Sequence, residues 1–296
     1  MKLLSLIILT YNSEKDIYNC LKSVYQYNDI GDGLEIIIVD NNSINYAEMY
    51  DRIKSLYPEI KIIANDKNGG YGQGNNVGIR AASAPIVSIM NPDVRLVMPT
   101  FKLMINCLQD EKVIMCGGKQ YKNENTPVPS FRFSCYKSGF SHSIGLCICR
   151  KYDKYLYRHM WLQGAFFAIK KEHFEQIGLF DETIFMYGEE FDIHTRLRKT
   201  FPHKKIVFLK DLHYLHLIED RIMTFESLYP PLRSEIVMCQ KHKYSIKKYI
   251  FDQKIANVIN WCMMLILFIF KKRPYTLKSY HVVQTVLSTL EKEFIK

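Results

Sequence analysis

Three acidic residues stand close together in the segment FMYGEEFDIHTRLRK, directly after an aromatic turn. They are Glu189, Glu190 and Asp192. Neighbouring carboxylates raise one another's pKa, which suits one of them to remove a proton from a reacting hydroxyl as a general base. The alternative is a negatively charged helix start that complements the helix macrodipole.

A single aspartate, Asp93, follows the apolar segment PIVSIM in the sequence NPDV. A carboxylate held by a proline turn at the end of a buried strand is well placed to bind Mg²⁺ or Mn²⁺, which often share their ligand shell with phosphate oxygens. The alternative is a turn aspartate that hydrogen-bonds its own backbone. Spacing alone leaves both open.

The stretch NGGYGQGNN, residues 68–76, contains four glycines within six residues, as phosphate-binding loops do. It fails the dinucleotide fingerprint GxGxxG, because glycine is missing at Asn75 and at Val77, where the possible readings require it. No GxxxxGK[ST] motif occurs, which excludes a P-loop triphosphatase. Two interpretations of this stretch remain. It is either a phosphate-binding loop that precedes a helix over 75–82 or a tight turn.

The first hundred residues alternate between apolar strands and amphipathic helices. Strands are expected at LLSLIILTY, LEIIIVD, IKIIAN and PIVSIM. This alternation predicts a parallel sheet with helices on both faces, in which ligands bind at the carboxyl ends of the strands. The polar clusters TYNSE, DNNS, NDKNGG and NPD fall at those ends. The sequence therefore predicts one site to which all four clusters contribute.

The middle of the chain, residues 100–160, is less regular, and its segment FRFSCYKSGFSHSIG, residues 131–145, is expected to form loops or edge strands. The eight cysteines include no CxxC pair, so a zinc site is not indicated. Cys147 and Cys149 are expected on one face of a strand as packed thiols. The N-terminal apolar segment is predicted to be a buried strand rather than a signal peptide, which favours a reducing, cytosolic compartment.

The net charge of +10 lies mainly in the C-terminal quarter, because residues 221–296 hold 13 Lys and Arg against 5 Asp and Glu. Its most hydrophobic segment, 255–270, precedes KKRP and is short for a transmembrane helix, which needs about 20 residues. Contact with a membrane surface through 241–273 is expected; internal packing, a homodimer and a true span are the alternatives. No RRM, KH or helix-turn-helix signature supports nucleic-acid binding.

An ordered set of motifs then identifies a family. It comprises IILTYNSEKDIYNCLKSV, EIIIVDNNS, NGGYGQGNN, NPDV, WLQGAFFAIKKEHFEQIGLFDETIFMYGEEFDIHTRLRK and HYLH. Together these resemble family 2 glycosyltransferases with the GT-A fold, most of all the rhamnosyltransferase-like branch that builds bacterial surface polysaccharides. The resemblance covers about residues 1–217. It implies an α/β catalytic domain over 1–220, with a mostly parallel sheet, a nucleotide-binding half (1–98) and an acceptor half (99–220); a basic helical extension over 221–296 follows.

The resemblance also implies roles for individual residues. The nucleotide-sugar would contact Thr10, Tyr11, Asn12, Glu14, Asp40, Asn41, Asn68, Gly69, Asn75, Asn91, Asp93, Gly164, Ala165 and Arg196. Asp93 stands at the last acid of the family's DxD motif and would bind the metal with His216, or with the nearby His213. Glu189 and Glu190 stand where the family has Glu-Asp; Glu190 is expected to be the base, with Glu189 as the alternative.

The implied reaction is inverting transfer of a sugar from a nucleotide-diphospho-sugar, dTDP-rhamnose for this branch, to a glycan or lipid-linked glycan. A divalent metal, Mg²⁺ or Mn²⁺, would be the cofactor. The alternatives are galactosyl, glucosyl or N-acetylhexosaminyl transfer from a UDP-sugar, and a non-catalytic nucleotide-sugar-binding scaffold. The protein is expected in the cytoplasm, on the inner face of the cell membrane.

Overall fold

The computed structural model describes residues 1–135, 137–217, 222–269 and 277–295. These residues form two compact units. The first comprises Met1–Ser130 and Leu162–Ile218, and the second Phe131–Trp161 and Glu219–Lys296. The domain boundary expected near residue 220 lies outside the described residues. The second unit takes in 131–161, a segment that the sequence assigns to the acceptor half.

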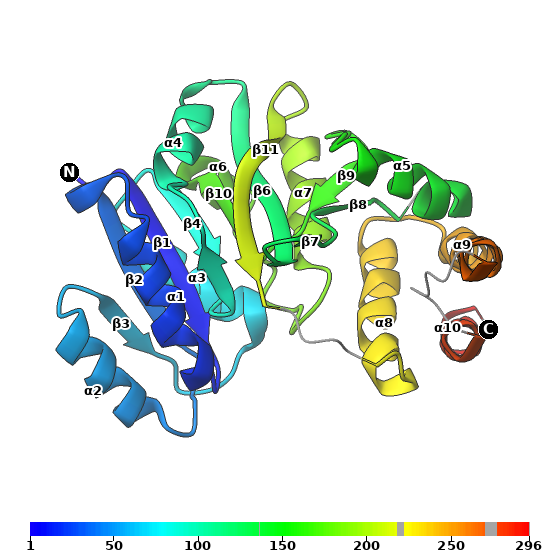
Figure 1. Cartoon of the computed structure of the whole chain (residues 1–296), viewed down its shortest axis with the longest axis horizontal. Coiled ribbons are helices and arrows are strands. Elements are labelled where there is room, and N and C mark those ends of the chain that lie inside the picture. Colours follow the sequence, from blue (N-terminus) through cyan, green and yellow to red (C-terminus); the bar gives the residue numbers. More distant parts are fainter. Residues whose placement is uncertain (136, 218–221, 270–276, 296) are drawn as a thin grey trace. The chain divides into compact units, whose positions relative to one another are not determined.

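The first unit is built on a mixed sheet flanked by helices (Figure 1). Its strands are β1 (Leu4–Thr10), β2 (Leu34–Asp40), β3 (Lys61–Ala64), β4 (Ile86–Met90), β5 (Val94–Leu96), β6 (Val113–Asn123), β7 (Thr126–Pro127), β10 (Phe166–Lys170) and β11 (Lys205–His216). Its helices are α1 (Glu14–Gln26), η1 (Gly31–Gly33), α2 (Tyr46–Leu56), α3 (Gly70–Ala81), α4 (Phe101–Gln109), α6 (Lys171–Gln176) and α7 (Glu189–Thr200).

The strands lie in the order β3-β2-β1-β4-β10-β6-β11-β5, with β7 paired to β6. The first four of these run parallel, as the alternation of strands and helices predicts. β10 is inserted antiparallel between β4 and β6, while β11 pairs parallel with β6 and antiparallel with β5. The α/β class is confirmed; the N-terminal half supplies four consecutive parallel strands, and β6 with β11 is a further parallel pair.

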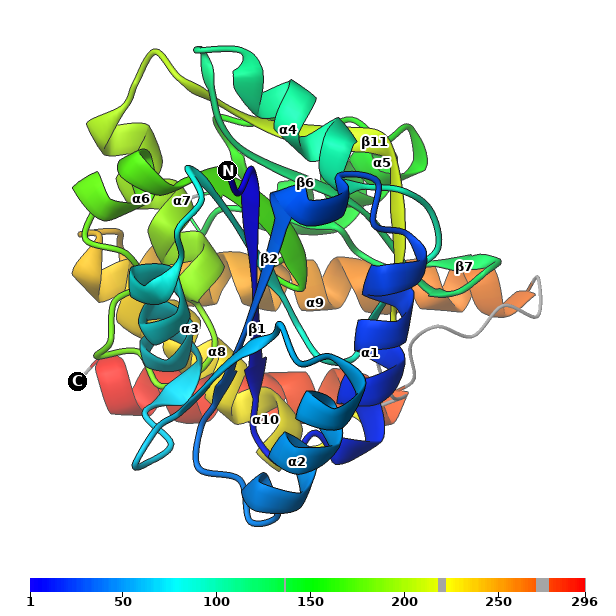
Figure 2. The same cartoon turned by 90° about the vertical axis from the view of Figure 1, so that its left-hand side faces the viewer.

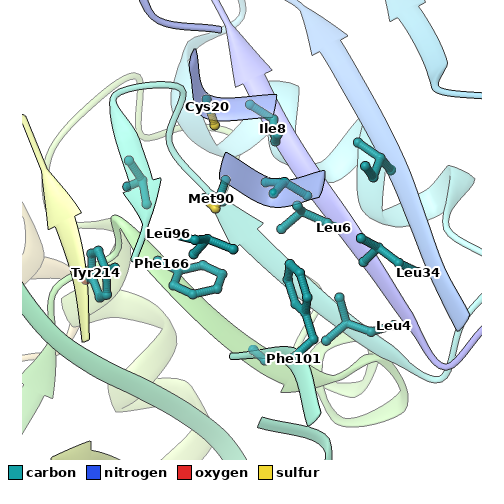
Figure 3. Packing of buried hydrophobic residues seen from close by; sticks show 14 of the residues in the cluster. Leu4, Leu6, Ile8, Cys20, Leu34, Met90, Leu96, Phe101, Phe166 and Tyr214 are labelled. Atoms are coloured by element: carbon teal, nitrogen blue, oxygen red, sulfur yellow. The ribbon is translucent and has the colours of Figure 1, made fainter. Parts of the chain in front are cut away.

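Strand β1 shows why its sequence is a continuous apolar run. Successive side chains of a strand point to opposite faces of the sheet. Leu4, Leu6 and Ile8 join a core cluster that includes buried residues of α1, α2 and α4 (Figure 3). Ile7 and Leu9 lie on the other face, against α3. Both faces are therefore covered, which requires apolar residues at every position.

Aromatic side chains extend this core across the sheet. The Phe166 ring of β10 meets Phe101 of α4 and Tyr214 of β11 edge-on, at centroid distances of 6.4 and 5.4 Å (Figure 3). All three side chains are buried. Such edge-to-face pairs add to the hydrophobic stabilisation of the large area that they bury.

The structure differs from three expectations of local structure. Residues 100–160 are more regular than expected, because they contain a helix, α4, and a long sheet strand, β6. Within residues 131–145 a short strand forms at Phe131–Phe133, as expected, but Ser141–Gly145 is helical. Cys147 and Cys149 lie on α5, not on a strand; two residues along a helix turn the side chain about 200°, so one is exposed and the other buried. The helix predicted over 75–82 is α3, which begins at Gly70.

The second unit combines a small sheet with helices. Its elements are β8 (Phe131–Phe133), β9 (Met160–Leu162), η2 (Ser141–Gly145), α5 (Leu146–Lys151), α8 (Phe225–Lys241), α9 (Ile246–Ile269) and α10 (Leu277–Phe294). Helices α9 and α10 lie side by side (Figure 2). Helix α8 begins with a capping box, in which Thr224 and Ser227 each accept a hydrogen bond from the other's backbone N–H.

Candidate active site

A cavity of about 530 Å³ opens at the carboxyl ends of β1, β2 and β4. It is lined by Leu9, Tyr11, Ser13, Asp16, Asn41, Asn68, Gly70, Tyr71, Asn91, Pro92, Asp93, Phe185 and Met186. All of these residues belong to the first unit. The polar clusters that follow the parallel strands meet here, at the edge where α/β sheets bind ligands.

Five of the predicted donor-binding residues line this cavity: Tyr11, Asn41, Asn68, Asn91 and Asp93. They follow three different parallel strands or precede α3, so the topology of the sheet brings them together. A cavity of this volume falls in the range of small-molecule binding sites, about 300–1,000 Å³.

The carboxylate of Asp40 lies behind the cavity wall and is fully buried. Its Oδ2 accepts hydrogen bonds from the hydroxyls of Thr10 (2.9 Å) and Ser43 (2.6 Å), and its Oδ1 accepts one from the Ser43 backbone N–H (2.8 Å). Ser43 Oγ in turn accepts from the N–H of Asn12, a residue with φ of +51°. Asp40 therefore joins the loops after β1 and β2 instead of facing the cavity.

The side chain of Asn41 forms part of a chain of amides along the cavity wall. Its Nδ2 donates to Asn68 Oδ1 (3.2 Å) and to the Gly70 carbonyl (3.0 Å), and its Oδ1 accepts from Asn65 Nδ2 (2.7 Å). The Gly70 N–H donates to Asn68 Oδ1 (3.0 Å). These bonds hold the start of α3 against the loop after β2.

The glycine stretch forms the first turns of α3, where its glycines allow close packing. Gly70 has φ of +89°, and a Cβ there would lie 2.3 Å from the Phe185 carbonyl oxygen. A Cβ at Gly74 would lie 2.3 Å from the Leu9 side chain. The Tyr71 N–H already donates to the Phe185 carbonyl (2.9 Å). Packing and positive φ thus explain the glycines without a phosphate.

Asp93 and His216 are paired, although they lie far apart in the chain. His216 Nε2 is 3.2 Å from Asp93 Oδ2. The Gln120 amide nitrogen donates to the Pro129 carbonyl, which turns Gln120 Oε1 toward His216 Nδ1 at 2.9 Å. Nδ1 therefore carries a proton and donates it, as the outer nitrogen of a metal-binding histidine usually does.

The surroundings of Asp93 fit a divalent cation. Burial alone would raise the pKa of this carboxyl, but the hydrogen bond and charge of His216, with the nearby Arg95, hold the pKa below its ordinary value. Asp93 Oδ1 is buried and has no hydrogen-bond partner within the described part of the chain. An unpaired carboxylate oxygen beside an imidazole nitrogen is a suitable ligand pair for Mn²⁺ or Mg²⁺.

The rival histidine lies elsewhere. His213 Nε2 is 2.9 Å from the Lys210 carbonyl, and its ring packs edge-on against Tyr121. Among the described residues, no three His, Cys, Asp or Glu side chains gather into a metal-binding group. An ion on Asp93 and His216 would therefore complete its ligand shell with phosphate or water oxygens.

The two adjacent glutamates at the start of α7 have different surroundings. Tyr187 and Gly188, both with positive φ, turn the chain into the helix. Glu190 Oε1 accepts a hydrogen bond from the Gly164 N–H (3.1 Å) and its side chain is half-buried. Glu189 is only 3% exposed, and burial together with the charge of Glu190 raises its pKa to about 8. At neutral pH Glu189 is therefore mostly protonated.

A buried histidine fixes the backbone of Glu190. His194 Nε2 accepts from the Leu162 N–H (3.1 Å), so its Nδ1 carries the proton that is donated to the Glu190 carbonyl (2.6 Å). Burial, with the charge of Arg198, lowers the pKa of His194 to about 3. The neutral imidazole keeps this tautomer and joins α7 to Leu162.

Tyr71, which the sequence does not single out, lies between the turn that carries Asp93 and the loop that binds Glu190. Its hydroxyl lies 3.1 Å from the Gly164 carbonyl and 3.3 Å from Asn91 Oδ1. Gly164 binds Glu190 through its N–H, and Asn91 precedes Asp93 by two residues. Burial, with the nearby carboxylates, raises the pKa of Tyr71, so the phenol remains a donor. An aromatic residue among glycines was its only signal.

The other predicted residues do not line the cavity. From the donor-binding set these are Thr10, Asn12, Glu14, Asp40, Gly69, Asn75, Gly164, Ala165 and Arg196, and the same holds for His216, Glu189 and Glu190. Arg196 is bound to the buried Asp192 (2.8 Å from Nε) and to the Ile177 carbonyl. Asn75 is buried and donates to the Tyr71 carbonyl (2.9 Å).

Other lining residues carry no clear pattern in the sequence. Asp16 is one; its carboxylate binds Arg95 at 2.9 Å, and Arg95 also donates to the Pro92 carbonyl, which braces the turn before Asp93. Phe185 and Met186 are exposed at the cavity edge, in the aromatic turn before α7. That turn is visible in the sequence, but its place beside the start of α3 is not.

Comparison with known proteins places this geometry in a family. The model of "Glycosyl transferase family 2" matches residues 5–190. The low-salt glycan biosynthesis hexosyltransferase Agl10 of Haloferax volcanii is 28% identical over 204 residues, covering 66% of this chain and 62% of that protein. The glycosyltransferase GlyG of Streptococcus pneumoniae serotype 4 is 24% identical over 227 residues, covering 73% of this chain and 70% of that protein. The chain thus spans less than two thirds of the length of Agl10.

Solved structures show the same fold. The mannosyltransferase PcManGT from Pyrobaculum calidifontis, in complex with GDP-Man and Mn²⁺, superposes with a TM-score of 0.61 at 14% identity, covering 99% of this chain and 87% of that one. TarS 1–349 of S. aureus, in complex with UDP, superposes with a TM-score of 0.53 at 18% identity, covering 87% of this chain and 70% of that one. The GT-A fold is confirmed.

Proposed function

The chain belongs to glycosyl transferase family 2, and on this premise we propose that it is a metal-dependent, inverting transferase acting on a nucleotide-diphospho-sugar. One observation carries the proposal. Asp93, which lines the cavity, is paired with His216, and the Tyr71 hydroxyl contacts both Asn91, two residues before Asp93, and Gly164, whose N–H binds Glu190. Asp93 and His216 are the proposed metal ligands, and Glu190 is the proposed general base.

The proposed donor lies in the cavity, with its nucleoside near Tyr11 and Asn41 and its diphosphate toward Asp93. The walls that hold it are stiffened by the Asp40 and Asn41 hydrogen bonds described above, so the site is largely preformed. A divalent ion held by Asp93 and His216 would neutralise charge on the departing diphosphate.

In the proposed reaction an acceptor hydroxyl attacks the anomeric carbon of the donor sugar. A bond forms between the hydroxyl oxygen and that carbon, the bond from the carbon to the diphosphate oxygen breaks, and the hydroxyl proton passes to Glu190. The Gly164 N–H donates to Oε1 of Glu190 and so orients the carboxylate that accepts the proton. Attack from the face opposite the leaving group inverts the configuration.

The proposed donor is dTDP-rhamnose, and the proposed acceptor is a glycan or lipid-linked glycan. Support for rhamnose comes from the sequence resemblance alone. Galactosyl, glucosyl or N-acetylhexosaminyl transfer from a UDP-sugar is the alternative within the same reaction. A non-catalytic nucleotide-sugar-binding scaffold is the alternative outside it.

A thermal-shift screen tests the donor and the metal together. Nucleotide-sugars are added with Mn²⁺, with Mg²⁺ and with EDTA; one donor class should raise Tm in the presence of metal, since a ligand at 100 times its Kd stabilises by about 2.7 kcal/mol. Asp93→Ala should lose the metal-dependent part of this shift, and the exposed control Asp32→Ala should keep it. A donor shift unchanged by EDTA and by Asp93→Ala would exclude the proposed metal site. Binding without transfer or donor hydrolysis would favour the scaffold.

A further inference from the structure

Helix α9 presents an exposed apolar stripe. Phe251, Val258 and Leu265 are 61%, 42% and 45% exposed, and Cys262 is exposed while Ile255 is half-buried. These five residues repeat at alternating intervals of four and three, so they share one face of the helix. At 1.5 Å per residue the stripe is about 21 Å long.

Other faces of α9 are covered by the second unit itself. The Gly139 N–H donates to Asp252 Oδ1 (3.2 Å), and the Ser143 hydroxyl donates to the Ala256 carbonyl (3.1 Å). On the side of α10, Asn257 Nδ2 donates to the Tyr280 carbonyl (3.2 Å).

A ring contact and an ion pair also join α9 to α10. The Trp261 ring lies 5.5 Å from the Tyr280 ring, and Lys254 forms an ion pair with Glu291. Figure 2 shows α10 running along α9. These contacts leave Phe251, Val258, Cys262 and Leu265 exposed, whereas Ile255 packs beside Gly139.

The charged residues near the start of α9 that make no ion pair with a described residue are lysines. Lys247 lies four residues before Phe251 and so continues the stripe by one turn, and Lys243 precedes the helix; both are exposed and make no ion pair with any described residue. The one acid of α9, Asp252, is buried and paired with Lys248. Two copies of this face would bring like charges together, whereas an anionic surface would attract them.

The length and polarity of the described helices restrict how this face can meet lipid. No helix in the described ranges is long and apolar enough to cross a membrane. A helix with one apolar face bordered by lysines binds by lying in the interface, with its apolar side chains among the acyl chains and its lysines at the headgroups.

We propose that the stripe Phe251, Ile255, Val258, Cys262 and Leu265 docks the second unit on an anionic lipid bilayer, with α9 parallel to the surface. Lys243 and Lys247 bind the lipid phosphates, and Phe251, Val258 and Leu265 enter the hydrocarbon border. This proposal goes beyond the transferase activity, because neither the stripe nor the lysines belong to the cavity.

Vesicle flotation with the full chain tests it. The wild type should float with vesicles of phosphatidylcholine containing 30% phosphatidylglycerol, about ten-fold less with pure phosphatidylcholine, and less as salt rises, because screened lysines attract lipid weakly. Failure of the wild type to float with the anionic vesicles would overturn the proposal.

Two pairs of variants locate the contact. Val258→Asp with Leu265→Asp should reduce flotation at least about ten-fold, because two apolar anchors are lost; Leu56→Asp with Val97→Asp, an equal change on exposed residues of the first unit, should float like wild type. Lys243→Gln with Lys247→Gln should weaken flotation more than Lys22→Gln with Lys112→Gln, which are exposed in the first unit. Equal flotation within either comparison contradicts the assignment.

Analytical sedimentation without lipid tests the alternative that a second copy of the chain covers the stripe. The wild type should be a monomer at micromolar concentration. A dimer that Val258→Asp with Leu265→Asp dissociates would overturn the membrane assignment in favour of self-association. Unchanged circular dichroism and an unchanged donor-induced Tm shift would show that the variants are folded.

Discussion

Glu189 and Glu190 are adjacent in the chain, yet the fold gives their carboxylates different surroundings. Glu190 is half-buried and bound to the Gly164 N–H, while Glu189 is buried and its Oε1 has no hydrogen-bond partner among the described residues. Removing a proton needs an ionised carboxylate that a substrate can reach. This difference supports the proposal that Glu190 is the base, a choice between the two glutamates that the sequence leaves open.

Glu190→Gln should lower kcat by about 10²- to 10⁴-fold, the usual contribution of a general base. The Kd of the donor should stay within about two-fold, because Glu190 does not line the donor cavity. Initial rates and donor titration measure both quantities, and the exposed Glu124→Gln is the control. Transfer within two-fold of wild type would remove Glu190 from the reaction.

Glu189 should make stability depend on pH. Its pKa is near 4.3 in an unfolded chain and about 8 in the folded protein. The folded state binds this proton more tightly, so its contribution to stability is complete at low pH and is lost as pH rises through the window from about 5 to 8.

Glu189→Gln keeps the neutral form at every pH and should remove this dependence. The free energy of unfolding of the variant, relative to wild type, should therefore increase from pH 5 to pH 8 and then level off. Urea unfolding at each pH measures it, with Glu124→Gln as the control. A difference that stays constant over this range would mean that Glu189 is ionised in the folded protein.

At the scale of the elements, α3 does two things at once. Its glycines let it approach the sheet closely, and its first turn carries Tyr71 to the point where the Asp93 turn and the Gly164 loop meet. The helix thus positions the proposed metal ligand Asp93 relative to the proposed base Glu190. Its packing and the geometry of the site are therefore coupled.

Gly78→Ala should destabilise the protein. The new Cβ would lie 2.5 Å from Ile7 Cγ2 and 3.1 Å from Val39 Cγ2, and overpacking of this kind costs about 1–3 kcal/mol, against at most about 1 kcal/mol gained in helix propensity. Gly145→Ala, also helical, meets its nearest atom at 3.6 Å and should not destabilise. The urea midpoint compares the two. Equal midpoints would show that α3 can shift away from the sheet.

Tyr71→Phe should reduce kcat about ten-fold, the effect of losing one buried hydrogen bond of about 1.4 kcal/mol, without changing the pH profile. A positioning role predicts that kcat falls while the donor Kd holds, because the ring still lines the cavity. Tyr50→Phe, on α2 and outside the cavity, is the control. An unchanged kcat would mean that Asn91 and Gly164 keep their places without the hydroxyl.

At the scale of the whole molecule, the two proposals assign different tasks to the two units. The cavity belongs entirely to the first unit, and the apolar stripe of α9 to the second. The family match covers residues 5–190, so it includes residues 131–161 of the second unit but not α8, α9 and α10. Donor binding and lipid binding should consequently protect different segments of the chain.

Hydrogen exchange tests this separation. Donor with Mn²⁺ should slow exchange around residues 9–13, 68–71 and 91–93, whereas anionic vesicles should slow it in 251–265. Asp93→Ala should lose the first footprint and retain the second. Loss of both footprints in this variant would show that the two tasks depend on one another.

Much of the fold follows from the sequence, because its signals are local. Apolar runs predict β1, β2 and β4, and the polar residues that end them predict the site, since parallel strands end at the same edge. The sequence likewise identifies the acids at the start of α7 and Asp93 as candidate functional residues, but not the residues that they contact.

The tertiary structure alone decides which partners these residues meet. The pairing of Asp93 with His216 and the contacts of Tyr71 with Asn91 and Gly164 depend on distances between elements that no spacing in the chain encodes. The pair of Asp192 with Arg196 differs, because the two residues stand four apart on one helix. The glycines of α3 show the limit of sequence spacing. Gly74 and Gly78 accommodate side chains of the sheet and Gly70 accommodates the backbone of Phe185, contacts that only packing between distant segments reveals.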